Sequence, residues 1–161
     1  ILFTVSSLQN NGLNLLPFAA EIAREHPKWE LIISPFHLLP KTPIPENLHL
    51  LEWVPQLELL DIADLSVNHG GINTMNECIH FQVPMLIVPG NRHDQNGCAA
   101  RANYHGIANL WDEETDPSTQ ILSTMQNEVI RKNLADFHAI YKAYQTDKKV
   151  EKEIKKFLGQ A

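Results

Sequence analysis

The chain has 161 residues, of which 43% are hydrophobic and 20% are charged, and its net charge is −6. This length predicts one domain that can bury its own core, and the hydrophobic content excludes a disordered chain. No apolar run approaches the roughly 18 residues of a membrane span. The acidic balance speaks against a nucleic-acid partner. Two cysteines are too few for a disulfide framework, and a reducing, cytoplasmic setting fits them.

Short apolar runs alternate with amphipathic stretches along the first 116 residues. Strands are predicted at 1–6, 29–34, 47–53, 65–68, 85–88 and 107–111. Helices are predicted from residue 15 up to Pro27, and at 56–63, 73–81 and 94–104. Four prolines make 35–45 a loop. Because strands that alternate with helices form parallel βαβ units, we expect an α/β fold with a doubly wound, Rossmann-like parallel sheet.

After Pro117 the sequence is wholly helical in pattern. Apolar side chains recur there at helical spacing from Ile130 to Tyr144, and the pattern continues beyond a charged break at 147–149. We therefore expect a single domain over 1–161, with an α/β core to about residue 116 and a helical tail over 117–161. The chain starts at Ile1, inside a predicted strand and without a methionine, so we expect it to be part of a longer protein.

The segment 69–77 follows a predicted strand and opens a helix. Its two glycines allow close backbone approach, and the first-turn amides carry the positive end of the helix dipole. The side chains of His69, Asn73 and Thr74 can add hydrogen-bond donors. This pattern predicts a phosphate site that needs no lysine. The alternative is an ordinary strand-to-helix turn in which Asn73 or Thr74 is the N-cap.

Three other places carry candidate binding residues. Glu77, further along the same helix, could accept from the two hydroxyls of a ribose, although helix carboxylates are more often solvated. Trp53, at the end of the third strand, could stack on a base, or it could simply pack on the core. Asp94 and Gln95 begin a helix and could bind hydroxyls, with Asp94 as an N-cap being the alternative. No third ligand at suitable spacing accompanies His93 and Asp94, so no metal site is predicted.

Catalytic signatures are missing from the sequence. It contains neither a Gly-x-Ser-x-Gly elbow nor a His-Glu-x-x-His motif. The first strand is followed by Ser6 and Ser7 rather than by a glycine-rich turn, which speaks against an ordinary NAD-binding domain. The sequence thus indicates a binding half more clearly than a reactive one.

Taken together, these segments resemble the signature of the UDP-glycosyltransferase superfamily (family 1 glycosyltransferases), in particular its bacterial macrolide-glycosyltransferase-like members. The matching positions are Trp53-x-Pro55-Gln56, His69-x-Gly71-x-Asn73-Thr74-x-x-Glu77, Val83-Pro84 and Asp94-Gln95. The resemblance implies the C-terminal, donor-binding domain of a GT-B fold, in which two Rossmann-like domains face each other across a cleft.

The resemblance assigns the nucleoside to four positions. Trp53 would stack on uracil, and the backbone at Val54 and Gln56 would pair with the edge of that base. Glu77 would hold both ribose hydroxyls, which favours UDP over dTDP.

The resemblance assigns the diphosphate and the sugar to the remaining positions. The diphosphate would contact Ser7, His69, Gly71, Asn73 and Thr74. Asp94 and Gln95 would bind hydroxyls of the transferred sugar. Ser6 stands where the family has the glycine of a Gly-Ser turn, so this sequence departs from the family pattern there.

The activity that the resemblance implies is the inverting transfer of a hexose from a UDP-sugar to an acceptor hydroxyl. In this family the catalytic base is a histidine of the N-terminal domain, so no catalytic residue is expected in this chain. The N-terminal domain would also bind the small-molecule acceptor. The UDP-sugar would be a co-substrate, and no metal or other cofactor is implied. Two alternatives stay open. One is a nucleotide-sugar epimerase of the same fold, although the Trp53-x-Pro55-Gln56 element speaks against it. The other is a stand-alone donor-binding subunit that needs a partner chain.

Overall fold

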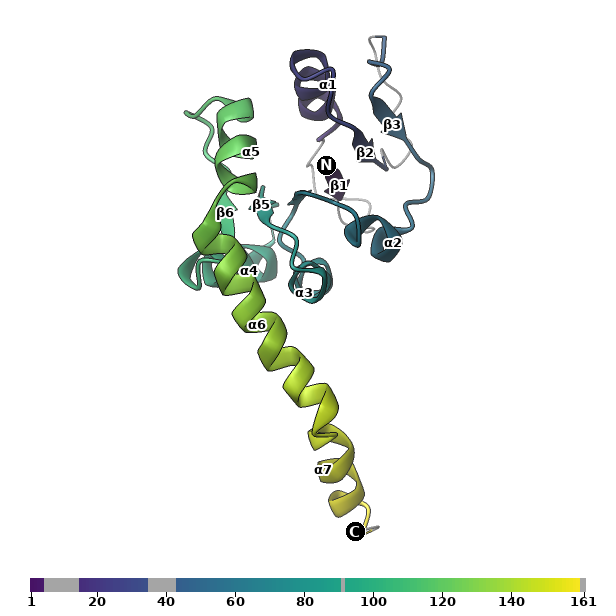
Figure 1. Cartoon of the computed structure of the whole chain (residues 1–161), viewed down its shortest axis with the longest axis vertical. Coiled ribbons are helices and arrows are strands. Elements are labelled where there is room, and N and C mark those ends of the chain that lie inside the picture. The colour runs from purple at the N-terminus through teal and green to yellow at the C-terminus, as the bar shows by residue number, and fades with distance from the viewer. Residues whose placement is uncertain (5–14, 35–42, 91, 160–161) are drawn as a thin grey trace.

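A computed structural model of the chain describes residues 1–4, 15–34, 43–90 and 92–159. The described strands are β1 (Leu2–Thr4), β2 (Leu31–Ile33), β3 (Leu48–Leu50), β4 (Ser66–Asn68), β5 (Met85–Ile87) and β6 (Ala108–Leu110). The described helices are α1 (Leu16–Glu25), α2 (Gln56–Leu60), α3 (Ile72–Phe81), α4 (His93–Tyr104), α5 (Pro117–Met125), α6 (Glu128–Thr146) and α7 (Lys149–Phe157) (Figure 1). The predicted alternation of strands and helices is confirmed, and strands β2 to β6 are shorter than predicted.

The sheet has the strand order β3-β2-β1-β4-β5-β6, and every neighbouring pair is parallel. This confirms the predicted doubly wound arrangement. The chain starts at the centre of the sheet and builds outward in both directions, so the order reverses between β1 and β4. Ligands of such sheets bind beyond the carboxyl ends of the strands at that point. Thr4, the last residue of β1, pairs there with Asn68, the last residue of β4.

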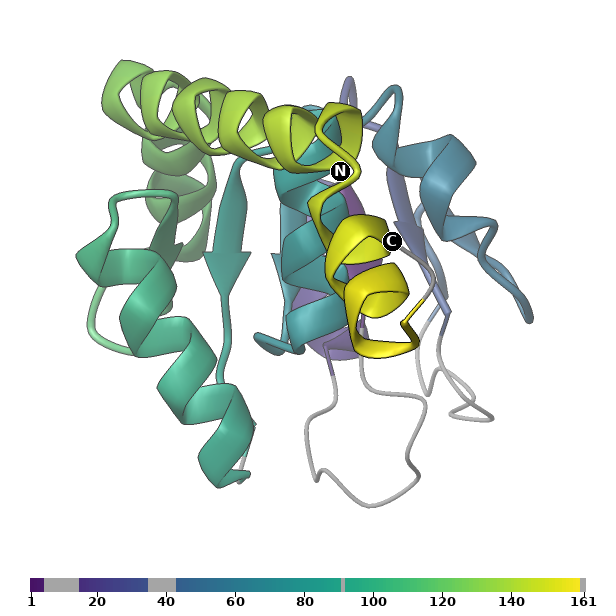
Figure 2. The same cartoon turned by 90° about the horizontal axis from the view of Figure 1, so that it is seen from below.

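Helices cover both faces of the sheet. Neighbouring strand residues point to opposite faces, so Leu2 packs in the core beneath α3, α4 and α6, whereas Phe3 packs in the core beneath α1 and α5. In Figure 2, α3 and α6 lie in front of the sheet and α1 lies behind it. Because both faces are covered, a central strand such as β5 is buried at every residue.

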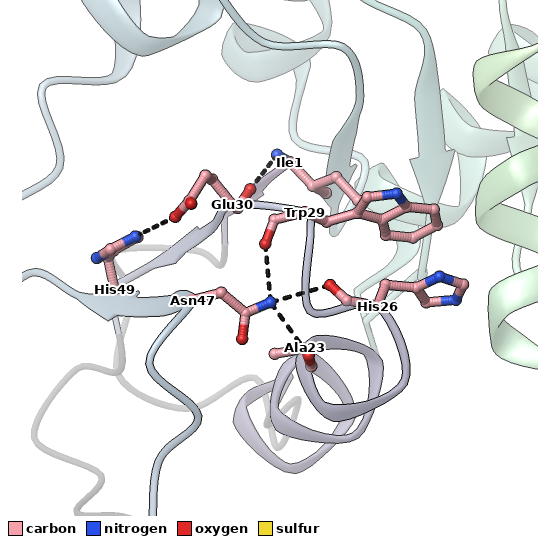
Figure 3. A network of polar contacts seen from close by, with 7 residues as sticks. All are labelled: Ile1, Ala23, His26, Trp29, Glu30, Asn47 and His49. Carbon is pink, nitrogen blue, oxygen red and sulfur yellow. Dashed lines mark hydrogen bonds and ion pairs between the residues drawn. The ribbon is translucent and has the colours of Figure 1, made fainter.

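Asn47, just before β3, holds together the end of α1 and the start of β2 at the amino edge of the sheet. Its Nδ2 donates hydrogen bonds to three carbonyl oxygens, those of Ala23 at 3.1 Å, His26 at 3.0 Å and Trp29 at 2.8 Å (Figure 3). Carbonyls at a helix C-terminus lack partners within the helix, so one side chain satisfies the end of α1 and the entry to β2 together. This edge lies opposite the carboxyl ends of the strands.

The C-terminal segment is helical as predicted, and it divides into three helices. Ile121 in α5 and Leu134 in α6 are fully buried, so both helices contribute to the core. The second half of α6 and all of α7 extend away from the sheet (Figure 1), and α7 buries no residue. Lys148, within the predicted charged break, has a left-handed backbone (φ 47°) between the two helices. Within the described ranges, no helix combines the length and apolarity needed to cross a bilayer.

Candidate functional site

The turn from β4 to α3 is tightly built at the carboxyl edge of the sheet. The Oδ1 of Asn68 accepts from the backbone N–H of Gly70 at 2.9 Å. Gly70 has a φ of +79°, which L side chains rarely adopt. A Cβ at this position would also lie 3.1 Å from the carbonyl oxygen of Gln95 and 3.1 Å from a methyl group of Ile87. Glycine therefore lets the start of α3 approach β5 and α4 closely.

The N-cap of α3 is Gly71, with φ −68° and ψ 135°, and it makes no side-chain cap hydrogen bond. Among the residues that the structure describes, no side chain is seen to accept from the first amides of this helix. The simpler alternative, that Asn73 or Thr74 caps this helix, is wrong, because both residues lie inside its first turn, whereas a capping residue lies just before it. The first-turn amides and the positive end of the dipole are thus available to an anion.

The His69 ring lies against this helix N-terminus. A Cβ on Gly71 would be only 2.6 Å from the Nε2 of His69, so the ring occupies the space that a side chain would fill. His69 is 7% exposed. Burial lowers its pKa below the ordinary 6.5; the backbone of Thr4 and the charge of Asp94 oppose that shift, and Arg92 adds to it. The lowered pKa favours the neutral imidazole, which has one N–H to donate.

Helix α2 brings a second group of predicted residues together. The Nε2 of Gln56, the first residue of α2, donates to the Oγ1 of Thr74 at 3.3 Å and to the Oε2 of Glu77. These contacts join three residues that the sequence places on two separate helices. These hydrogen bonds hold the Glu77 carboxylate against α2, about one helical turn beyond the first-turn amides of α3.

The predicted pair on α4 separates into one exposed and one buried side chain. The N-cap of α4 is Arg92, so the alternative that Asp94 is the N-cap is wrong; Asp94 lies in the first turn and is exposed. Gln95 is 3% exposed, and its Oε1 lies over Gly90, where an added Cβ would be 2.5 Å away. Asp94 thus faces solvent, whereas Gln95 turns inward.

Buried polar atoms without hydrogen-bond partners gather at this edge. Among the described residues four such side-chain atoms occur, and three of them belong to Thr4, His69 and Gln95. The atoms are Oγ1, Nδ1 and Oε1 respectively. Orphaned buried polar atoms are uncommon, and binding sites are one place where they persist. Thr4 was not among the residues predicted from the sequence; a polar side chain near the carboxyl end of the first strand is the signal that could have indicated it.

The remaining predicted residues lie around this centre. Trp53 is 83% exposed, and Val54 packs partly against the core beneath α3. Ser7 lies outside the described residues. Among the residues that the structure describes, no three His, Cys, Asp or Glu side chains are arranged to hold a metal ion.

The family of the chain follows from its sequence as well as its fold. The model of the glycosyltransferase family 28 C-terminal domain matches residues 37–156, which is most of the chain. The chain belongs to this family. The resemblance to glycosyltransferase C-terminal domains is thereby confirmed.

Relatives of this glycosyltransferase domain agree with the assignment. It is 39% identical over 88 residues to the uncharacterized UDP-glucosyltransferase YdhE of Bacillus subtilis (strain 168), an alignment that covers 54% of this chain and 22% of that protein. The crystal structure of the glycotransferase of kitacinnamycin aligns with a TM-score of 0.83 and 24% identity, over 96% of this chain and 42% of that one.

A second solved structure also aligns with the glycosyltransferase domain. The spinosyn rhamnosyltransferase SpnG, solved with thymidine diphosphate, has a TM-score of 0.74 and 22% identity, over 88% of this chain and 41% of that one. These likenesses confirm the Rossmann-like fold of GT-B glycosyltransferases. The chain spans about a fifth of the curated relative and less than half of either solved protein.

Proposed function

We propose that this domain binds the nucleotide-sugar donor, and that the whole protein transfers the sugar to a hydroxyl of a small-molecule acceptor. The observation that carries this proposal is the contact of Gln56 with Thr74 and Glu77, next to the uncapped N-terminus of α3. Thr74 and Glu77 are three residues apart, which is about 4.5 Å along a helix axis. That spacing suits a ligand whose ribose lies beside its phosphates.

We assign the diphosphate to the α3 N-terminus and His69. The amides around Gly71 and Asn73 would donate to the phosphate oxygens, together with the Thr74 hydroxyl. His69 would donate from its neutral ring, whose Nε2 lies over Gly71. As the bond to the sugar breaks, negative charge grows on the leaving diphosphate, and these fixed donors would stabilise it. This arrangement supports transfer without a metal ion.

We propose UDP as the preferred nucleotide. A carboxylate can accept hydrogen bonds from both hydroxyls of a ribose, and the Glu77 carboxylate accepts a hydrogen bond from Gln56 that would hold it in place. The exposed indole of Trp53 would stack on the base, beside the backbone of Val54 and Gln56. YdhE is named a UDP-glucosyltransferase, whereas SpnG was solved with thymidine diphosphate, so the proposal for UDP rests on Glu77.

The remaining steps are proposed for the whole protein. Asp94 would bind hydroxyls of the sugar from its exposed place on α4, and Gln95 would do so after turning outward from Gly90. The acceptor and the catalytic base for an inverting displacement are expected in the part of the relatives that this chain does not span. We also propose a cytoplasmic location, in keeping with two free cysteines. The comparisons offer nothing in favour of an epimerase.

A binding experiment tests this proposal. Isothermal titration should show that the chain binds UDP more tightly than uridine, and UDP more tightly than its 2′-deoxy form. Glu77→Gln should remove the preference for the ribose hydroxyl but keep the preference for the diphosphate. Glu58→Gln is the matched control, because Glu58 is an exposed carboxylate of the neighbouring helix α2. A Glu77→Gln variant that still distinguishes UDP from the 2′-deoxy form would contradict the assignment.

A further inference from the structure

Thr4 lies beside the proposed diphosphate site, and no contact among the described residues accounts for its buried hydroxyl. Its side chain points to the α3 face of the sheet, because Leu2, two residues earlier, packs in the core beneath α3. In the ladder Thr4 pairs with Asn68, directly before His69. Thr4 is 7% exposed, and its Oγ1 has no hydrogen-bond partner among the described residues. A buried hydroxyl that is left unpaired at this position needs an explanation.

The unpaired group of His69 is chemically complementary to this hydroxyl. The Nδ1 of His69 is also buried and unpartnered among the described residues. Burial lowers the pKa of His69, and the backbone carbonyl of Thr4, which lies near the ring, opposes that shift, so Thr4 and the imidazole are neighbours. A neutral imidazole has one nitrogen that donates and one that accepts. If a hydroxyl donates to Nδ1, the ring proton is held on Nε2. In this structure Nε2 is the nitrogen that lies over Gly71, at the start of α3.

We propose that Thr4 is a positioning residue for His69. When the donor binds, the Thr4 hydroxyl donates to Nδ1, and the Nε2–H of His69 is thereby aimed at the diphosphate. No proton is transferred in this arrangement; it selects one neutral tautomer and one ring orientation. The inference rests on the proposed function, because the diphosphate is the group that Nε2–H would contact.

The test compares Thr4→Val, which keeps the shape of the side chain, with Thr4→Ser, which keeps the hydroxyl. UDP-glucose is the probe, because its phosphates do not titrate near neutral pH, and uridine is the reference that lacks phosphate. We expect Thr4→Val to weaken UDP-glucose about tenfold, as a lost hydrogen bond to a binding group would, and to leave uridine unchanged. Thr4→Ser should stay within about twofold of the original chain. Thr146→Val, on the distant part of α6, is the control.

Nitrogen-15 NMR of the His69 ring gives a readout that a purely structural role would not change. With UDP-glucose bound, the original chain and Thr4→Ser should show the Nε2–H tautomer, and Thr4→Val should show a mixture. Unchanged affinity for UDP-glucose in Thr4→Val, or an equal loss for UDP-glucose and uridine, would overturn the inference. If the original chain binds uridine but gains nothing from the diphosphate, the proposed function fails first. Should Thr4→Val not fold, Thr4→Ala and Thr4→Ser supply the same comparison.

Discussion

Replacing Gly71 with alanine separates the role of the His69 ring from the folding of the chain. Gly71 has φ −68° and ψ 135°, a conformation that alanine adopts without strain. The new Cβ would lie 2.6 Å from Nε2 and 3.1 Å from Cε1 of His69, whereas ordinary contacts begin at 3.4 Å. The ring must therefore shift by roughly the 0.8 Å between these values, away from its place over the helix N-terminus.

The expected loss follows from the hydrogen bond that His69 would make. A hydrogen bond to a charged group contributes about 1.5–3 kcal/mol, so Gly71→Ala should weaken the binding of UDP by about 10- to 150-fold. Uridine lacks the diphosphate, and its affinity should stay unchanged. The free energy of unfolding should fall by only about 1 kcal/mol, the typical result of displacing one side chain in a packed region.

Two other glycines provide matched controls. Gly97 lies in α4 with no atom within 4 Å of an added Cβ, so Gly97→Ala should raise the free energy of unfolding by about 0.5–1 kcal/mol and leave binding unchanged. Gly70 has φ +79°, so Gly70→Ala should lower the free energy of unfolding by about 1–2 kcal/mol through backbone strain. Urea denaturation and titration with UDP and uridine measure both effects. A Gly71→Ala variant that binds UDP like the original chain would refute the reasoning.

Three further outcomes follow from the structure. Trp53→Ala should weaken the binding of UDP and of uridine equally, because base–aromatic stacking contributes about 1–3 kcal/mol to both. Because Trp53 is exposed, the thermal midpoint should not change. Weaker binding of UDP alone, measured by titration, would contradict this. Asn47→Ala should lower the free energy of unfolding in urea by about 1–2 kcal/mol without altering UDP affinity, since its three hydrogen bonds lie at the opposite edge of the sheet. The pKa of His69 is lower in the folded chain than in the unfolded chain, so the unfolded chain binds more protons between the two pKa values. The free energy of unfolding should therefore fall as the pH drops from above 6.5 toward the folded-state pKa of His69. His69→Gln should make this decline shallower, and equal declines in the two proteins would contradict the prediction.

The alternation of elements could be predicted from the sequence because each buried strand is a short, nearly continuous apolar run. The run at 85–88 is an example, and β5 covers Met85–Ile87. Strand lengths were less predictable. The apolar pattern indicated a strand over 47–53, whereas β3 covers only Leu48–Leu50, because pairing with β2 ends there and Trp53 turns to solvent. Sequence patterns record burial but not where a neighbouring strand stops.

The candidate site could be predicted as a set of residues but not as a set of contacts. Gln56 and Glu77 were identified by their place in motifs, yet their hydrogen bond depends on how α2 packs against α3. The inward turn of Gln95 depends likewise on the space that Gly90 leaves. Thr4 carries no motif of its own, and only the register of β1 against β4 brings it next to His69. Such features arise from tertiary packing.

The most direct test of the account is the thermal unfolding of this chain with and without UDP. A ligand that binds only the folded state at about 100 times its Kd stabilises it by about 2.7 kcal/mol. For a domain of this size that is a rise in Tm of about 5–10 °C. We predict such a rise with UDP, a much smaller one with uridine at the same concentration, and little rise with UDP in Gly71→Ala. A folded chain whose Tm does not move at millimolar UDP would contradict the claim that this edge of the sheet binds a nucleotide-sugar donor.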